Sequence, residues 1–386
     1  MSKVTRGFVA MVVVFFSTTL AWDGHAAQKT PAEMIGEQAG KTIAGAVEKS
    51  LPGAMQQIIE SESQKAAGRR VNKVRRQVLV RTAARGVARR VRWKKTESTE
   101  EVSAQGNTFS FTHDGLKRTY HLHVPSSYDK TKPMPLLIAL HGSKGDGKSM
   151  VGLTKGGFNT ISDRERVIVV YPNGIKERWN DGRVAHRDRG GVIDDVGFIS
   201  DLIDYLAQEL NLDRRRVYAT GMSSGAILSH RLACDLSEKI AAIAPVAGGI
   251  AESVVSACSP PRPVAVLAMN GTEDPTWKGG RVGLPGQKRQ LLSATATVQF
   301  WAKKNGCQSV PEVAWEPDRD LEDGTRVKVE TYPCRDGAEV VLYAVEGGGH
   351  TWPGGKPYLP RIVGRTSRDI DANEVIWDFF KRHALK

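Results

Sequence analysis

The pattern of apolar and polar positions changes near residue 104. Residues 28–103 are rich in Ala, Gln, Glu, Lys and Arg, and within them Val71, Val74 and Val78 have helical spacing. From Thr108 onward, short apolar or alternating runs of strand length alternate with runs of helical period. The pattern predicts strands at Thr108–Thr112, Arg118–Val124, Pro135–Leu140, Val167–Tyr171, Arg216–Thr220, Ile240–Val246, Val264–Met269 and Val340–Val345, and helices at Val196–Leu210, Ala226–Leu236, Gln290–Lys304 and Asp371–His383.

A hairpin followed by alternating strands and helices predicts an α/β fold with a mostly parallel central sheet and helices on both faces. Residues 104–386 are enough for one substantial core, so we expect a single domain there. Residues 1–27 have the character of a signal peptide, because Lys3 and Arg6 precede an uncharged run from Gly7 to Trp22. The run is short for a membrane span of about 20 residues. A cleaved signal is therefore favoured over a retained anchor, and we expect a secreted or periplasmic protein.

The positive charge of the chain is local. Hydrophobic residues make up 40% and charged residues 25%, which is typical of a globular protein and excludes a polytopic membrane protein. Lys and Arg number 55 and Asp and Glu 42, but residues 65–95 hold 13 basic and no acidic residues, so the rest is neutral. Specific nucleic-acid binding is therefore not predicted. The basic tract is either a solvated helical or disordered spacer, which we favour, or an amphipathic helix that binds anionic lipid or cell-wall polymer.

Four cysteines permit three pairings. Their order favours two local disulfides, Cys234–Cys258 and Cys307–Cys334, in keeping with an oxidising compartment. No zinc-type spacing is present. His121 and His123 alternate along a predicted strand, which more often indicates ordinary strand surface than a metal site.

The strongest chemical motif is Gly221-x-Ser223-x-Gly225, placed between an apolar strand and an Ala-containing helix. Glycines two residues before and after a serine permit the sharp strand-to-helix turn of a nucleophile elbow. The helix N-terminus then favours the negative charge that develops at the hydroxyl. Ser223 is the predicted nucleophile.

A nucleophilic serine needs a base, and the base needs an orienting carboxylate. Asp274 follows the predicted strand at Val264–Met269, and His350 follows the one at Val340–Val345. Serine, acid and histidine in this order predict an acyl-transfer triad at the ends of successive strands. Glu273 is a second candidate for the acid, and a turn residue or a loop histidine is the alternative role for each position.

The loop after the strand at Pro135–Leu140 has two interpretations. In the first, the Ser143 and Ser224 backbone N–H groups form an oxyanion hole, and His141 supports the loop instead of acting as a base. In the second, Gly142–Ser149 matches G-x-x-x-x-G-K-S and, with Lys148, binds nucleotide phosphates. The glycines after this motif predict a poor phosphate-capping helix, so the nucleotide-hydrolase interpretation is the weaker one.

Further polar and aromatic residues are candidates for the substrate pocket. Asp194 and Asp195 precede a predicted helix and are first of all capping residues. Trp179 and Trp352 lie in Gly-flanked loops and are candidate substrate-binding residues, with core packing as the alternative.

With these motifs in place, the chain resembles the secreted polyhydroxybutyrate depolymerase and feruloyl esterase group of the α/β-hydrolase superfamily. The resemblance covers about Gly115 to His383. It rests on Leu140–Gly142, Asp194–Phe198, Gly221–Gly225, Ala244–Gly248, Gly271–Pro275, Gly347–Pro353 and Asp369–Ala372.

The resemblance implies a Ser223, Asp274 and His350 triad, two local disulfides, no metal or organic cofactor, and ester substrates such as polyhydroxybutyrate oligomers or feruloyl and acetyl esters. Thr276–Lys278 departs from the family pattern, which makes Trp277 a candidate substrate-binding residue on an altered side of the pocket. With the absence of a polymer-binding module after the last predicted helix, this favours a small or soluble ester. The alternatives are a nucleotide hydrolase and a non-catalytic protein that binds anionic surfaces.

Overall fold

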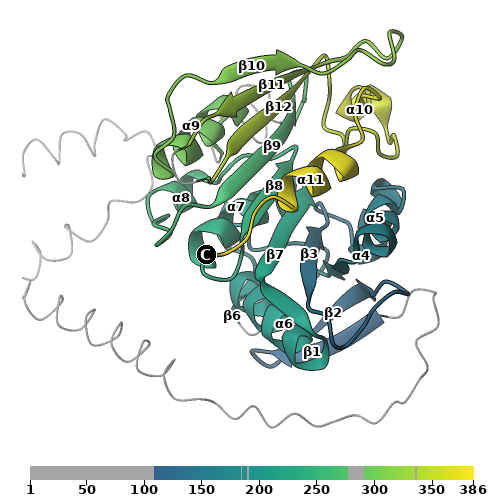
Figure 1. Ribbon diagram of the computed structural model, residues 1–386, viewed down its shortest axis with the longest axis vertical. Coiled ribbons are helices and arrows are strands. Elements are labelled where there is room, and N and C mark those ends of the chain that lie inside the picture. The colour runs from purple at the N-terminus through teal and green to yellow at the C-terminus, as the bar shows by residue number, and fades with distance from the viewer. Residues whose placement is uncertain (1–107, 184, 189–190, 277–290, 335–336) are drawn as a thin grey trace, which may run out of the picture. The chain divides into compact units, whose positions relative to one another are not determined.

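The computed structural model describes residues 108–386 apart from 184, 189–190, 277–290 and 335–336 (Figure 1). The predicted signal peptide, the segment 28–103 with its basic tract, and Trp277 lie outside the described residues. In the described part, no helix has the length and apolar character needed to cross a membrane.

A ten-stranded sheet runs through the described domain in the order β1-β2-β4-β3-β7-β8-β9-β12-β11-β10. The six strands from β4 to β12 in that order are mutually parallel, and the strands outside them on both sides are antiparallel. The strands are β1 (Thr108–His113), β2 (Leu116–His123), β3 (Met134–Leu140), β4 (Ile168–Pro172), β7 (Leu212–Met222), β8 (Ala242–Val246), β9 (Ala265–Gly271), β10 (Glu312–Trp315), β11 (Arg326–Tyr332) and β12 (Val340–Glu346), with β5 (Arg187–Asp188) and β6 (Gly191–Val192) as a separate ribbon.

All eight predicted strands are present within a few residues, whereas β10 and β11 were missed. The residues of β10 are exposed throughout, so no buried face gave an apolar pattern. In β11, valines alternate with charged residues, and four of its seven positions are only half-buried. These are the last two strands at one edge of the sheet, where burial imposes the weakest pattern.

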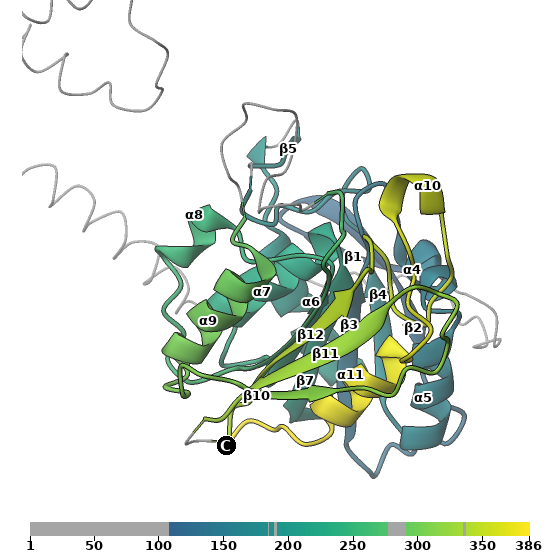
Figure 2. The same ribbon diagram turned by 90° about the horizontal axis from the view of Figure 1, so that it is seen from above.

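Helices cover both faces of the sheet, as predicted (Figure 2). Leu136 and Ile138 of β3 point into a core with α6, α7 and α9, and Leu137 and Ala139 point into a core with α4, α5 and α11. Alternate residues of one strand therefore build two separate apolar layers. The helices are α4 (Gly147–Leu153), α5 (Gly157–Glu165), α6 (Asp195–Glu209), α7 (Ser224–Asp235), α8 (Glu252–Val255), α9 (Ala294–Lys304), α10 (Pro360–Val363) and α11 (Ala372–Phe380).

The glycine-containing segment 150–158 is not one continuous helix, since α4 ends at Leu153 and α5 begins at Gly157, but a short helix does begin at Gly147. Asp146 caps α4 through a capping box with Ser149, and Met150 is buried against the sheet. A cap and a buried anchor together outweigh the low helix propensity of glycine.

Both predicted disulfides are present. Cys234–Cys258 links the end of α7 to the segment before β9, and Cys307–Cys334 links the end of α9 to the end of β11. No cysteine is free, and each bridge is local, with sequence separations of 24 and 27 residues.

The parallel strands bring the candidate site residues together. His141 follows β3, Ser223 follows β7, Asp274 follows β9 and His350 follows β12. Because the carboxyl ends of parallel strands lie at one edge of a sheet, four segments that are distant in sequence meet there.

Candidate active site

Ser223 lies at a strained turn between β7 and α7. Its backbone has φ 56° and ψ −114°, a conformation that L-residues rarely adopt and that often marks a functional site. The turn is held by the Ser223 N–H, which donates to the Val246 carbonyl at 3.0 Å. A Cβ at Gly225 would lie 2.3 Å from the Leu140 carbonyl oxygen, so only glycine permits this close approach. The predicted elbow geometry is therefore present.

Asp274 and His350 form a buried hydrogen-bonded pair. The Nδ1 of His350 lies 2.7 Å from the Oδ2 of Asp274, and the residues are 8% and 3% exposed. The Thr276 backbone N–H donates to the other Asp274 oxygen at 2.8 Å. A carboxylate can only accept, so it holds the proton on Nδ1 and leaves Nε2 as the basic nitrogen.

Glu273, the alternative acid, is exposed, and its backbone N–H donates to the Gly348 carbonyl at 2.9 Å. The buried contact with the imidazole is made by its neighbour, Asp274.

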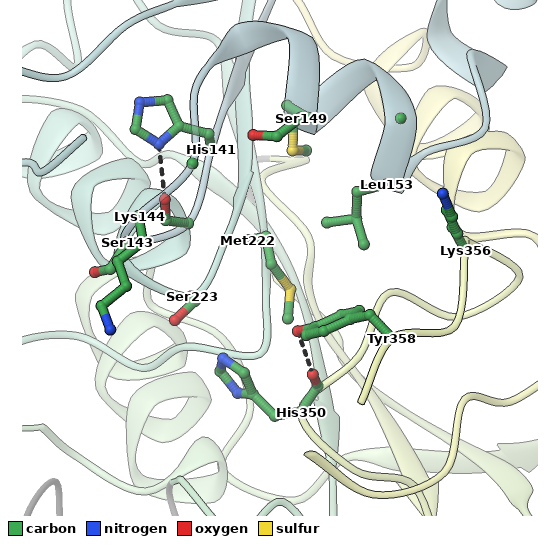
Figure 3. Close-up of a pocket in the computed structure, with 14 residues that line it drawn as sticks. His141, Ser143, Lys144, Ser149, Leu153, Met222, Ser223, His350, Lys356 and Tyr358 are labelled. Carbon is green, nitrogen blue, oxygen red and sulfur yellow. Dashed lines mark hydrogen bonds between the residues drawn. The ribbon is translucent and has the colours of Figure 1, made fainter. Parts of the chain in front are cut away.

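Ser223 and His350 line the same pocket, and Figure 3 shows their side chains pointing toward one another. The Tyr358 hydroxyl donates to the backbone carbonyl of His350 at 2.7 Å and so holds the histidine segment from the other side. Burial and the charge of Asp274 raise the pKa of Tyr358 to about 12, so the phenol stays protonated.

The loop after β3 reaches the nucleophile. A Cβ at Gly142 would lie 3.5 Å from the Cβ of Ser223. The loop turns through Ser143 and Lys144, with the Gly145 N–H donating to the Gly142 carbonyl at 3.1 Å. Within the described part of the chain, the Ser143 N–H has no hydrogen-bond acceptor. Ser224 is the first residue of α7, where an N–H has no carbonyl one turn earlier to bond. Both candidate oxyanion donors are therefore available.

His141 supports this loop, as predicted, in a form that cannot act as a base toward Ser223. Its Nε2 accepts the Gly174 N–H at 3.0 Å, and its Nδ1 lies 2.7 Å from the Gly142 carbonyl. The ring is therefore the neutral Nδ1–H tautomer with both nitrogens engaged. Burial lowers the pKa of His141, which keeps it neutral.

The two described tryptophan candidates lie in the core. Trp179 is 4% exposed and donates through Nε1 to the His141 carbonyl at 2.8 Å, so it supports the loop after β3 from behind. Trp352 is fully buried and packs edge-to-face on Phe158. Neither lines the pocket, which corrects their assignment as substrate-binding residues in favour of the packing role.

The pocket has a volume of about 570 Å³. Sequence reasoning found the part of the wall that comes from the loop after β3, the elbow and His350, but it missed the residues from the body of α4 and from the loop after His350, which carry no motif. The residues that line it are His141, Gly142, Ser143, Lys144, Gly145, Ser149, Met150, Gly152, Leu153, Met222, Ser223, His350, Lys356 and Tyr358.

The Gly142–Ser149 loop is not arranged to cradle a phosphate. The donors that would bind it are engaged: the Ser149 N–H with the Asp146 carboxylate at 2.8 Å, and the Gly147 N–H with the Asn173 side chain at 2.7 Å. The carboxylate of Asp146 occupies the helix start and would repel an anion there. This geometry contradicts the nucleotide-binding alternative.

Asp194 and Asp195 have structural partners. The Asp194 side chain accepts the Gly197 N–H at 2.9 Å, as a helix cap does. Asp195 forms a fully buried ion pair with Arg118 at 2.6 Å. Its other oxygen accepts the Asn180 N–H at 2.6 Å, directly beside Trp179. Asp195 therefore anchors the segment that supports the loop after β3.

Two groups of residues carry side chains of the kind that bind metal ions. His121 and His123 have separate neighbours, Thr108 and Asp163. Among the described residues, the side chains of His113, Asp114 and Asp194 offer three atoms within 4.8 Å of one another.

However, the contacts of His113 favour an ion-pair role over a metal site, because its Nδ1 lies 2.8 Å from Asp201 Oδ2 and its Nε2 lies 3.8 Å from Asp114 Oδ2. Burial by itself lowers its pKa, but the hydrogen bond to Asp201 and the nearby carboxylates outweigh burial and raise it. The carboxylates thus favour the protonated imidazole, in which neither ring nitrogen has a lone pair for a metal ion.

Comparison with known proteins finds esterases. The family model described as "Esterase PHB depolymerase" matches residues 118–273. The protein named "Putative esterase NocK" of Nocardia uniformis subsp. tsuyamanensis is 30% identical over 277 residues, which are 69% of this chain and 79% of that protein. Feruloyl esterase B of Piromyces equi is 30% identical over 273 residues, 68% of this chain but only 44% of its own length. Among solved structures, an acetyl xylan esterase from Aspergillus awamori covers 72% of this chain and 100% of its own, with 16% identity and a TM-score of 0.48.

The sheet order, with helices on both faces and the elbow after β7, is that of an α/β-hydrolase. Since the match to NocK spans more than two thirds of both chains, the chain belongs to the esterase and PHB depolymerase family and is a carboxylic ester hydrolase.

Proposed function

We propose that the protein is an exported serine esterase that hydrolyses small or soluble carboxylic esters through an acyl-enzyme on Ser223. The observation that carries this proposal is the strained elbow at Ser223 in one pocket with the buried His350–Asp274 pair. Nucleophile, base and orienting acid are the three parts that this chemistry requires.

In the first half of the reaction, the Nε2 of His350 takes the proton from the Ser223 hydroxyl while Oγ attacks the ester carbonyl carbon. Asp274 stabilises the imidazolium that forms. The carbonyl oxygen becomes an oxyanion, which accepts hydrogen bonds from the N–H groups of Ser143 and Ser224. His350 then gives its proton to the departing alkoxide, and the C–O bond breaks to leave the acyl-enzyme.

In the second half, His350 takes a proton from a water molecule that attacks the acyl carbonyl. The second tetrahedral intermediate collapses, Ser223 recovers its proton from His350, and the free acid leaves. All parts of both halves are protein groups: a base, an orienting acid and two backbone donors.

The relatives suggest the range of substrates. The description of the matched family model names PHB depolymerase. Relatives are named feruloyl esterase and bifunctional acetylxylan esterase/xylanase. We propose hydroxybutyrate oligomers, feruloyl esters and acetyl esters as the classes to test first.

Export is the second part of the proposal. Two formed disulfides are typical of oxidising compartments and support it. It is tested by the mass of the N-terminal peptide of protein collected outside the cytoplasm. A mature chain that begins near residue 28 is expected, and an intact Met1 on exported protein would contradict the cleaved signal.

The catalytic proposal is tested with p-nitrophenyl esters of increasing acyl length, using wild type and Ser223→Ala. We expect wild type to turn over at least one ester and to be labelled by a fluorophosphonate, with both signals lost in Ser223→Ala. Ser229→Ala is the matched control, because Ser229 is buried in α7 and bonds the Gly225 carbonyl. Equal labelling of wild type and Ser223→Ala would refute Ser223 as the nucleophile.

A further inference from the structure

The pocket around Ser223 has an unusual charge. Two lysines line it, Lys144 and Lys356, and none of its described lining residues is a carboxylate. Within the part of the chain that the structure describes, neither ammonium forms an ion pair or hydrogen bond. A concave surface lined by charges of one sign concentrates ligands of the opposite sign.

The backbone of Lys144 adopts a conformation that is unfavourable for residues other than glycine. Its φ is 64°, in the left-handed region that glycine adopts without strain. The turn is held by the Lys144 N–H, which donates to the Glu177 carbonyl at 2.9 Å. The side chain lines the pocket beside the nucleophile, and Figure 3 shows Lys144 next to Ser143 and Ser223.

Lys356 lies on the opposite side of the pocket (Figure 3). Its backbone N–H donates to the Leu153 carbonyl at the end of α4, at 2.8 Å, so the position of its backbone is held while its side chain is exposed. Between Ser223 and Lys356 the wall is formed by Met222, Leu153 and Tyr358. From Ser223 outward, a bound substrate would therefore meet first the nucleophile, then an apolar wall, and then the ammonium group of Lys356.

We propose that the natural substrate is an ester that bears a free carboxylate, separated from the reacting carbonyl by a short apolar chain. The carboxylate pairs with Lys356, the chain lies along Met222, Leu153 and Tyr358, and Lys144 adds positive potential beside the reacting carbonyl. This inference rests on the proposed function and narrows its substrates to amphiphilic anions, such as half-esters of dicarboxylic acids or esters of hydroxy acids. In a half-ester the acyl part carries the carboxylate, and in a hydroxy-acid ester the alcohol part carries it.

Two matched pairs of esters distinguish these sources. p-Nitrophenyl hemiglutarate against p-nitrophenyl valerate varies the charge of the acyl part, and 3-butyryloxybutanoate against its methyl ester varies the charge of the alcohol part. For at least one pair, we expect a kcat/KM about tenfold or more higher for the anion at low salt. The preference should decrease in 0.5 M NaCl, because salt screens exposed charges.

Variants at Lys356 test the contact itself. The ratio of anionic to neutral kcat/KM should fall about tenfold in Lys356→Gln and should reverse in Lys356→Glu, an effect that a merely structural lysine would not produce. Lys148→Gln is the matched control, because Lys148 is exposed in the first turn of α4 and does not line the pocket. Its ratio should equal that of wild type.

Each other outcome has a definite meaning. Turnover of neutral and anionic esters at equal kcat/KM, with no change in Lys356→Glu, overturns the inference and leaves the serine esterase intact. An equal drop of the ratio in Lys148→Gln also overturns it, since the effect would then be one of general surface charge. Absence of turnover of all four esters, with no fluorophosphonate labelling of Ser223, overturns the proposed function and the inference together.

Discussion

Asp274→Asn keeps the shape of the side chain but removes the carboxylate oxygen that orients His350, so it tests the orienting role alone. In the structure, Oδ1 accepts the Thr276 N–H at 2.8 Å and Oδ2 faces the Nδ1 of His350 at 2.7 Å. An asparagine of the same shape must keep its oxygen toward the Thr276 N–H, because its NH₂ group cannot accept. Its NH₂ therefore faces Nδ1 and donates to it. The imidazole proton then moves to Nε2, and the lone pair that would take the Ser223 proton is lost.

The expected size of this effect is large for catalysis and small for folding. Loss of the correct tautomer in a triad of this kind lowers kcat by about 10³–10⁴, which is about 4–5.5 kcal/mol of transition-state stabilisation. Since the substitution is isosteric and both hydrogen bonds have a replacement, we expect the free energy of unfolding to change by about 1 kcal/mol or less.

The assay is kcat for a neutral p-nitrophenyl ester, together with urea unfolding of the same preparations. Glu273→Gln is the control, because Glu273 is the neighbouring carboxylate and is exposed; it should keep kcat within about twofold. An Asp274→Asn variant with more than a tenth of wild-type kcat would refute the reasoning. So would a Glu273→Gln variant that loses activity to the same extent.

Three further predictions concern stability. Asp195→Asn leaves the Arg118 guanidinium buried without its counter-charge and should lower the free energy of unfolding in urea by about 3–5 kcal/mol. The double variant with Arg118→Met should recover most of this loss. Full stability of the single variant would contradict a buried ion pair. Burial lowers the pKa of His230 to about 3, so between about pH 6.5 and 3 the unfolded chain binds a proton that the folded chain does not, and stability falls as pH falls, by about 1.4 kcal/mol per pH unit. Urea unfolding at pH 7 and pH 5 should show a smaller difference in His230→Gln, and an unchanged slope would contradict a neutral buried ring. Removal of the Cys234–Cys258 bridge by a double serine substitution should lower stability by about 3 kcal/mol, and equal urea midpoints for the variant and wild type would contradict this.

The elements that were predicted well share a physical origin. Strands such as β3 and β4 are buried along their whole length, so nearly every residue is apolar and the run is readable without a structure. The edge strand β10 has no buried residue and left no such signal. The short helix α4 was not predicted for a different reason: it is stabilised by a cap and a buried Met150, which a pattern of helical period does not reveal.

The site residues also fall into those that the sequence predicted and those that it did not. Ser223, Asp274 and His350 were predictable because each follows a readable strand in the order that the chemistry requires. Tyr358 and Lys356 were not, since they lie in a loop without period or motif and enter the pocket only when that loop packs on α4.

What the chain order encodes directly is local: which runs are strands, where glycines permit a sharp turn, and which residue follows each strand. These properties depend on neighbours within a few positions, so reading them needs no knowledge of the packing. Whether Trp179 or Trp352 faces a substrate or the core, and whether the loop before α4 holds a phosphate or Asp146, depends on groups that arrive from elsewhere in the chain. The same holds for the two lysines of the pocket, Lys144 and Lys356. They follow different strands, and the packing of the sheet and its loops makes them face one cavity.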